Sequence, residues 1–260
     1  MKKENNETGA FIGFVLLSSN RWDKQKFIDD CMADWGLALS DEDDDDTLDE
    51  DDNDTLVVTM GDAMLGVSLM PAPVPNGEAE HYASGNYMWD NAVEVVQSHR
   101  AHILVSVLGK DGALLDKGRL FTKLVASCLK QENAIAVYTD GAVFQPQFYR
   151  ECASIMQQGE DALPILNWVW FGIYRTEELS GIYTYGMRKF GKEEMEVYTD
   201  HASLNDVRSF LLDIVAYVLD YDVTLKDGET IGFSEDQKLA ITLSDAIALE
   251  GKSLKLEYPQ

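Results

Sequence analysis

The sequence predicts an α+β fold of two ferredoxin-like halves, each with the element order βαββαβ, packed as one compact unit. Residues 11–108 alternate apolar runs and amphipathic stretches in the order β-α-β-β-α-β. Part of this order recurs after residue 134. The segment NAVEVVQSHRAHILVSVLGKDG is also echoed by RSFLLDIVAYVLDYDVTLKDG, and both segments end in Lys-Asp-Gly. This echo of helix plus strand indicates two related halves.

Hydrophobic periodicity places the elements of the first half. The run FIGFVLL is short, apolar and rich in β-forming residues, which predicts a buried strand. Phe27, Cys31 and Trp35 recur every four residues, as on one face of an amphipathic helix. Two apolar segments around a Gly-Asp turn predict a hairpin, and HILVSVL predicts a central strand. The expected elements are strands at 11–17, 55–60, 64–70 and 102–108, and helices at 21–35 and 78–99.

The second half is expected to follow a connecting helix that carries an apolar stripe. The run WVWFGIY is apolar on both faces when its residues alternate, so it predicts a strand covered on both sides rather than an aromatic ligand shelf. The domains predicted in this way are 1–116 with an acidic insertion at 40–54, the connecting segment 117–133, and 134–260 with the C-terminal strands. The later elements are a helix at 117–130, strands at 134–139, 168–174, 182–190 and 194–198, helices at 146–157 and 204–219, and strands within 223–258.

The charge balance restricts the kinds of partner. The 260 residues carry 46 acidic and 21 basic side chains, and the formal net charge is −25. Such a surface repels phosphate backbones and anionic membranes, so we expect neither nucleic acid nor membrane as a partner, and a basic protein would be attracted. The three cysteines are widely spaced, with no CxxC pair, which favours free thiols in a reducing compartment. No signal peptide or membrane span is recognised, so a cytoplasmic location is expected.

The most acidic stretch reads SDEDDDDTLDEDDNDTL, with eleven carboxylates within residues 41–54. A calcium loop of the EF-hand type needs glycine at its sixth position, where Asp46 stands, and a helix afterwards, where a strand is expected. We therefore interpret the run as a solvated loop, in which like charges repel. It could hold cations weakly and without specificity, or contact a basic partner. The residues of this candidate acidic interaction loop are Asp43, Asp44, Asp45, Asp46, Asp49, Asp51 and Asp52.

Two histidines form a weak candidate for a metal site. His99 and His102 are three residues apart, a spacing that suits zinc only if both lie on one helical turn. Here the segment passes from a helix end into a strand. The simpler interpretation is that His99 is favoured at the negative end of the helix dipole and that His102 starts a buried strand. A third ligand could come in space only from His81 or His201, so neither a metal nor a cofactor is expected.

A polar and aromatic cluster opens the helix after the proline-rich turn. Loops and helix starts often carry binding sites. The same residues also suit structure, with Tyr82 and Trp89 packing and Asn86 hydrogen-bonding the backbone. A binding groove, if present, is expected first at His81, Tyr82, Asn86, Trp89 and His201.

The sequence lacks the common motifs of catalysis. It contains no GxSxG, no GxxxxGK[ST] and no GxGxxG after a strand. Cys31, Cys128 and Cys152 lie on apolar helical stripes, which is typical of core thiols and not of nucleophiles. The sequence therefore inclines away from an enzyme, with no catalytic residue assigned.

Several stretches resemble a bacterial family catalogued as domain of unknown function 4261. They are GFVLLSSNRWD, NYMWDNAVEVVQSHRAHILVSV, LPILNWVWFGIYR, GIYTYGMRKFGKEEMEV and DGETIGFSEDQKLAITLS, which together span most of the chain. The resemblance implies no known activity. The stretch TYGMRKFGKEEMEV, followed by an apolar helix, is also similar to bacterial Suppressor-of-fused-type proteins. That similarity implies an immunity or interaction module for toxins.

Two functions remain open at this point. The leading hypothesis is a non-catalytic acidic interaction protein, an immunity-type or regulatory partner of a basic protein. The competing hypothesis is a small-molecule-binding protein or enzyme with a pocket between the halves near His81, Asn86, Trp89 and His201. A partner that is released by salt would favour the first hypothesis. A deep pocket with convergent polar groups of shifted pKa would favour the second.

Overall fold

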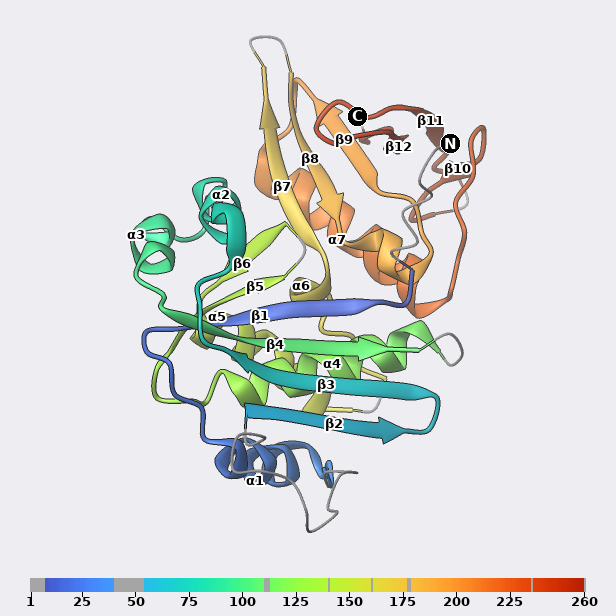
Figure 1. Cartoon of the computed structure of the whole chain (residues 1–260). Helices are drawn as coiled ribbons and strands as arrows, with labels where there is room; N and C mark the ends of the chain where they lie inside the picture. Colours follow the sequence, from blue (N-terminus) through green and yellow to red (C-terminus); the bar gives the residue numbers. More distant parts are fainter. Residues whose placement is uncertain are drawn as a thin grey trace, which may run out of the picture. The chain divides into compact units, whose positions relative to one another are not determined.

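The computed structural model describes residues 8–39, 54–109, 113–139, 141–159, 161–176, 179–234 and 236–259. The chain divides into two units (Figure 1). The first unit is Gly9–Asn167, and the second is Trp168–Gln260 with the N-terminal residues up to Thr8. Each unit contains one six-stranded sheet with helices. The α+β class is therefore confirmed.

The first sheet has the strand order β2-β3-β4-β1-β5-β6, and every neighbouring pair is antiparallel. The prediction of a ferredoxin-like half is not confirmed. In a split βαβ unit the first and third strands lie side by side and parallel, whereas here β4 lies between β3 and β1. The strands are β1 (Phe11–Leu17), β2 (Thr55–Met60), β3 (Ala63–Met70), β4 (Ala101–Leu108), β5 (Ala134–Thr139) and β6 (Ala142–Phe144).

Helices pack on both faces of this sheet. The long α4 packs on β1 and β4, where Phe11 lies 6.1 Å from Phe121 between ring centroids. On the opposite face, Leu16 and Val143 join a core with residues of α2 and α3, among them Ala83. The helices are α1 (Lys24–Trp35), α2 (Glu78–Ser84), α3 (Ala92–Gln97), α4 (Leu114–Cys128), α5 (Pro146–Ala153) and α6 (Ile165–Trp168), with 3-10 turns at Pro75–Gly77 and Ser154–Gln157.

The helix expected at 78–99 is two short helices, because the chain turns away from helical structure between Gly85 and Asn91. The Asn86 amide stabilises this break. Its Nδ2 donates to the Val143 carbonyl at 2.6 Å, and its Oδ1 accepts from the Met88 amide at 2.9 Å. A side chain that bonds the backbone in this way competes with helix formation.

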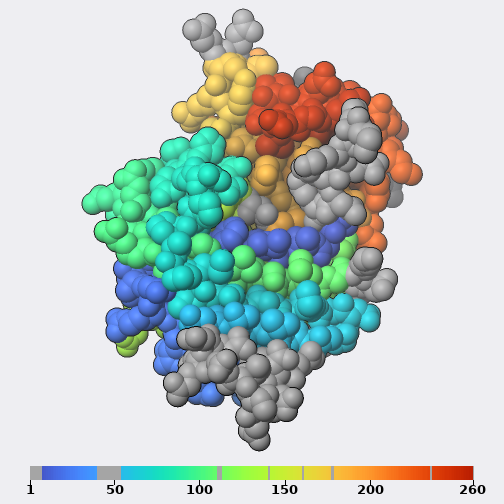
Figure 2. All heavy atoms as spheres, in the orientation of Figure 1, coloured from blue at the N-terminus to red at the C-terminus, as the bar shows by residue number. Residues whose placement is uncertain are grey.

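Part of the face that carries α2 and α3 remains open. Figure 2 shows side chains of β1, β4, β3 and β2 side by side, next to the two helices. Ile12, Val57, Met64 and Met70 are exposed large apolar residues on these strands. This open surface is therefore apolar and contains no charged strand residue.

The second sheet has the order β10-β11-β12-β9-β8-β7 and one long helix, α7 (Leu204–Asp220). Its β12 and β9 are parallel, and the other neighbours are antiparallel. The element order is βββαβββ, so a second ferredoxin-like half is not confirmed either. The strands are β7 (Trp170–Arg175), β8 (Ser180–Tyr185), β9 (Met195–Thr199), β10 (Thr230–Ile231), β11 (Leu239–Asp245) and β12 (Lys252–Leu256), with a 3-10 turn at Met187–Phe190.

The division of the chain differs from the one that the sequence predicts. A boundary at 117–133 would assign residues 134–144 to the second half, but these residues form β5 and β6, which pair with each other and with β1. The division lies after Asn167 instead. The echoed segment also loses its strand, because residues 221–229 form turns and irregular structure after α7. None of the helices in the described parts of the chain has the length and apolar character of a membrane crossing.

Candidate functional site

The two faces of the second sheet differ in chemistry. Residues that alternate along β8, β9 and β12, such as Ile182, Val197 and Leu254, are apolar and buried. The helix α7 contacts β8 and buries Leu211 and Val215, so it supplies the core on this face. The helix lies behind β7 and β8 in Figure 1.

The opposite face carries tyrosines, glycines and one ion pair. The strand register aligns Gly172, Tyr183, Glu196 and Lys255 across four strands. A second row aligns Tyr174, Gly181 and Tyr198, and Tyr185 lies on the same face opposite Trp170. We call this surface the tyrosine face; its tyrosines are Tyr174, Tyr183, Tyr185 and Tyr198.

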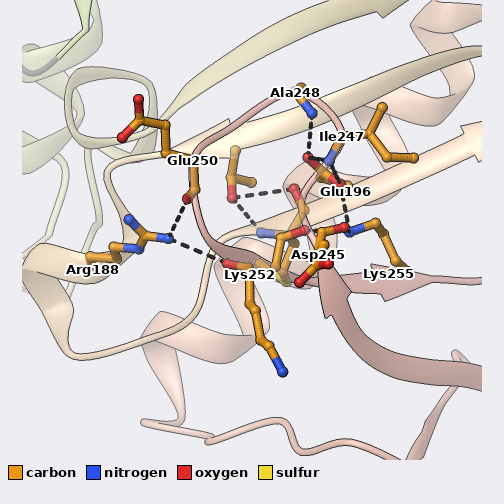
Figure 3. Close-up of polar contacts among 11 residues, drawn as sticks. Arg188, Glu196, Asp245, Ile247, Ala248, Glu250, Lys252 and Lys255 are labelled. Atoms are coloured by element: carbon orange, nitrogen blue, oxygen red, sulfur yellow. Dashed lines mark hydrogen bonds and ion pairs between the residues drawn. The ribbon is translucent and has the colours of Figure 1, made fainter. Parts of the chain in front are cut away.

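Glu196 is the polar centre of this face (Figure 3). Its side chain is fully buried, yet its oxygens accept from Lys255 Nζ at 2.8 Å, from the Ala248 amide at 2.9 Å and from the Ile247 amide at 3.1 Å. Lys255 Nζ also donates to the Asp245 carbonyl at 3.0 Å. The carboxylate therefore fastens the connection between β11 and β12 to the sheet.

The bonds to Glu196 decide its protonation. Burial alone would raise its pKa, because a charged group loses hydration. The hydrogen bond from Lys255, followed by those from Ala248 and Ile247, holds the pKa below its usual value. Glu196 is thus a buried carboxylate that stays ionised because a cation and backbone donors replace water.

Glu194, two residues earlier, has the opposite behaviour. It accepts from Thr184 Oγ1 at 2.7 Å, from the Gly186 amide at 2.9 Å and from the Arg188 amide at 3.3 Å. These bonds hold the chain at the start of the 3-10 turn Met187–Phe190. No lysine is bonded to this carboxyl group, and burial raises its pKa to about 7. Glu194 therefore titrates near neutral pH.

The tyrosine rings lie across glycines of the neighbouring strands. A Cβ atom at Gly172 would lie 2.1 Å from Tyr183 Cζ, and one at Gly181 would lie 2.4 Å from Tyr198 Cδ1. Tyr174 meets Tyr198 edge to face, with the centroids 5.9 Å apart. Burial, followed by the charge of Glu196, raises the pKa of Tyr198. Only glycine leaves room for these rings, as in the cross-strand pairing of aromatic residues with glycine.

The groove residues predicted from sequence occupy different places. In the first unit, Trp89 is buried in the core with α2 and α3, and Asn86 bonds the backbone as described. Tyr82 stacks on Tyr138 at 5.5 Å, and the exposed His81 contacts Tyr82 edge to face. These four residues therefore have packing or backbone-bonding contacts.

His201 belongs to the second unit, where it is exposed. Its Nδ1 lies 3.1 Å from Asp200 Oδ1 and 3.0 Å from Thr199 Oγ1, and its Nε2 lies 3.3 Å from the Pro259 carbonyl. The hydrogen bond with Asp200, followed by that with Pro259, raises the pKa of His201.

The two weak metal candidates make backbone contacts. His99 is buried; its Nε2 accepts from the Val74 amide at 2.9 Å, so its Nδ1, 2.5 Å from the Val96 carbonyl, carries the proton. His102 Nδ1 lies 2.8 Å from the Ala72 carbonyl, and burial lowers its pKa. Within the described residues, no group of three or more His, Cys, Asp or Glu is placed to hold a metal ion.

The other sequence candidates are placed only in part. The acidic loop residues Asp43, Asp44, Asp45, Asp46, Asp49, Asp51 and Asp52 lie outside the described residues. Cys31 and Cys128 are buried, and burial raises the pKa of both thiols, that of Cys31 to about 12. Cys152 is partly exposed.

Residues 183–257 match the family model of a domain of unknown function, DUF4261. This match confirms the resemblance for that segment, which holds the quoted stretch DGETIGFSEDQKLAITLS and nearly all of GIYTYGMRKFGKEEMEV. No curated protein and no solved structure matches the chain. The similarity to Suppressor-of-fused-type proteins has no support in these comparisons.

The matched segment contains most of the tyrosine face, including Glu194, Glu196 and Lys255. Sequence reasoning did not single out these residues. A signal is present, because Glu196 interrupts an apolar strand between Met195 and Val197. Many other acidic residues hide that signal in so acidic a chain.

Proposed function

We propose that this protein is a non-catalytic acidic interaction protein of the bacterial cytoplasm that binds a basic protein in an immunity-type or regulatory role. The observation that carries the proposal is the formal net charge of −25. Acidic residues outnumber basic ones even when the run at 41–54 is set aside. Free thiols at Cys31, Cys128 and Cys152 suit a reducing compartment.

The mechanism is electrostatic. A strongly negative surface attracts a positive partner over a distance of about one Debye length, roughly 8–10 Å at physiological salt. This attraction raises the rate of productive encounter and selects against acidic partners. Contacts at short range then determine which basic partner remains bound.

The roles of the buried polar groups support this proposal over a catalytic one. Glu196 and Glu194 accept hydrogen bonds that hold the β11–β12 connection and the 3-10 turn. His99 bonds two backbone groups of the first unit. Each of these groups therefore has a structural use.

Affinity purification from cells that make the protein, with elution by steps of increasing salt, tests the proposal. A basic partner that leaves the column as the salt rises is the expected result, because salt screens exposed charges. The partner should then bind the purified protein directly.

A variant in which every Asp and Glu of residues 41–54 becomes Asn and Gln provides the matched comparison, because it keeps the length of the chain. If the acidic run contributes to binding, the variant binds the partner more weakly while its thermal unfolding is unchanged. A partner that is acidic, or that stays bound at high salt, would contradict the proposal.

A further inference from the structure

We propose that the tyrosine face of the second unit binds arginine side chains of the basic partner by stacking. This inference rests on the proposed function, since it names the chemistry by which the partner is held at short range. It concerns Tyr174, Tyr183 and Tyr198, which line β7, β8 and β9 beside the buried Glu196. All three tyrosines are partly exposed.

The geometry presents aromatic ring faces to a ligand. Tyr183 lies over Gly172, since its Cζ, Cε1 and hydroxyl oxygen all fall within 2.4 Å of the position of a Cβ atom there. Tyr198 lies over Gly181 in the same manner. Both rings thus lean across the next strand in the same direction, from β9 toward β7. One face of each ring rests on the backbone, and the other is directed away from the sheet.

The electrostatic surroundings favour a cation on these rings. Lys255 is paired with Glu196, and Lys192 with Asp222 at 2.6 Å. Arg188 donates to the carbonyl groups of Glu250 and Lys252 (Figure 3). The nearby basic side chains are thus engaged within the unit, while Glu193 and Asp200 are exposed at the two ends of β9.

Arginine fits this surface better than the alternatives. Its guanidinium group is planar and weakly hydrated, so it stacks on an aromatic face, whereas the lysine ammonium is a compact and strongly hydrated charge. Nucleic-acid bases also stack on tyrosines, but their phosphates are repelled by a chain of net charge −25. The chemistry of the site therefore selects arginine within a basic segment.

Fluorescence anisotropy with two labelled peptides, nona-arginine and nona-lysine, tests this inference on the full-length protein. The peptides have equal charge, so an interaction that reads charge alone binds both alike. We expect nona-arginine to bind about fivefold more tightly, the effect of one stacked guanidinium. The substitution Tyr183→Leu, which removes the ring face and keeps an apolar side chain, should abolish the part of this preference that the ring provides.

Three variants control the measurement. Tyr183→Phe retains the ring and should retain the preference. Tyr221→Ala removes a more exposed tyrosine, 72% accessible, at the end of α7 and should change nothing. Tyr174→Leu, on the edge strand β7, serves as the second test should Tyr183→Leu fail to fold.

The outcomes distinguish this inference from the proposed function. Equal affinity for the two peptides, or an arginine preference that both leucine variants keep, would overturn the tyrosine site and leave the acidic interaction function standing. A preference carried by carboxylates alone gives the second of these results, because arginine also binds carboxylates more strongly than lysine does. Loss of binding to both peptides by the wild-type protein at low salt would contradict both proposals.

Discussion

The two sheets of this chain achieve stability by different means. The six strands of the first sheet contain no Asp, Glu, Lys or Arg, and one of its faces packs on α4 through residues such as Phe11 and Val15. The second sheet carries Glu196 and Lys255 on adjacent strands, together with four tyrosines. An acidic chain can thus exclude charge from one sheet and build it into another, provided that each buried charge receives partners.

Glu194 and Glu196 show how much the partners matter. Both carboxyl groups are almost completely buried and lie two residues apart. Lys255 and two backbone amides lower the pKa of Glu196, whereas burial raises that of Glu194 despite its three hydrogen bonds. The difference teaches that a cation decides whether a buried carboxylate of this sheet is charged at neutral pH.

The largest effect is expected from opening the core of the first sheet. Phe11→Ala removes a buried ring that packs on Phe121 and should lower the free energy of unfolding of the first unit by about 4 kcal/mol. The neighbouring Ile12, 39% exposed on the same strand, is the matched control, and Ile12→Ala should cost far less. Urea unfolding followed by circular dichroism measures both; equal losses would show that the open face is buried in solution.

Breaking the ion pair of the second sheet is expected to have the next largest effect. Lys255→Met leaves the Glu196 charge buried without its cation and should destabilise the second unit by about 3 kcal/mol. Lys192→Met breaks a pair whose partner Asp222 is exposed, so no measurable change is expected. A Lys255→Met variant as stable as the wild type in urea would show that the pair has no structural role.

Glu194 should impose a pH dependence of the opposite sign from that of an ordinary paired carboxylate. Its pKa is about 7 in the folded protein and 4.5 as the reference value, so the folded state holds the proton more tightly. Stability should then fall as the pH rises, by about 2 kcal/mol between pH 5.5 and 7.5.

The variant Glu194→Gln should lose this slope. His102, whose pKa is lowered by burial, adds a slope of the other sign to wild type and variant alike, so it cancels when the two profiles are subtracted. Urea unfolding at several pH values gives the profiles. A wild type and variant with parallel profiles would show that Glu194 is not held protonated.

The smallest effect separates two glycines of the tyrosine face. At Gly181 a Cβ atom would meet the Val197 carbonyl oxygen at 2.5 Å as well as the Tyr198 ring, and backbone cannot move aside cheaply. At Gly172 the nearest atoms all belong to the Tyr183 ring, which can rotate. We expect Gly181→Ala to cost about 2 kcal/mol and Gly172→Ala less. The reverse order in thermal unfolding would contradict the packing of rings on glycines.

Local sequence patterns predicted individual elements better than their arrangement. The bounds of β1, β2 and β5 agree with the sequence prediction, because each is a short apolar run with clear ends. The break after α2 was missed, since it depends on Asn86 reaching Val143, a contact between distant residues. Strand order was missed for the same reason: pairing partners are chosen by tertiary packing.

The candidate site was harder to predict than the fold. Asn86 and Trp89 were correctly given structural alternatives, as a backbone-bonding and a packing residue. Glu196 acquires its role only when Lys255 and Ile247, more than fifty residues later, fold over it. The pairing of Tyr183 with Gly172 likewise depends on the register between two strands. No local spacing encodes such contacts.

The dissociation constant of the purified complex with the basic partner, measured as a function of NaCl concentration, tests the central claim most directly. The account predicts that affinity falls steeply and linearly in a plot of log Kd against log salt, and that the slope becomes shallower when the acids of residues 41–54 are neutralised. Affinity that stays constant between low and high salt would contradict it.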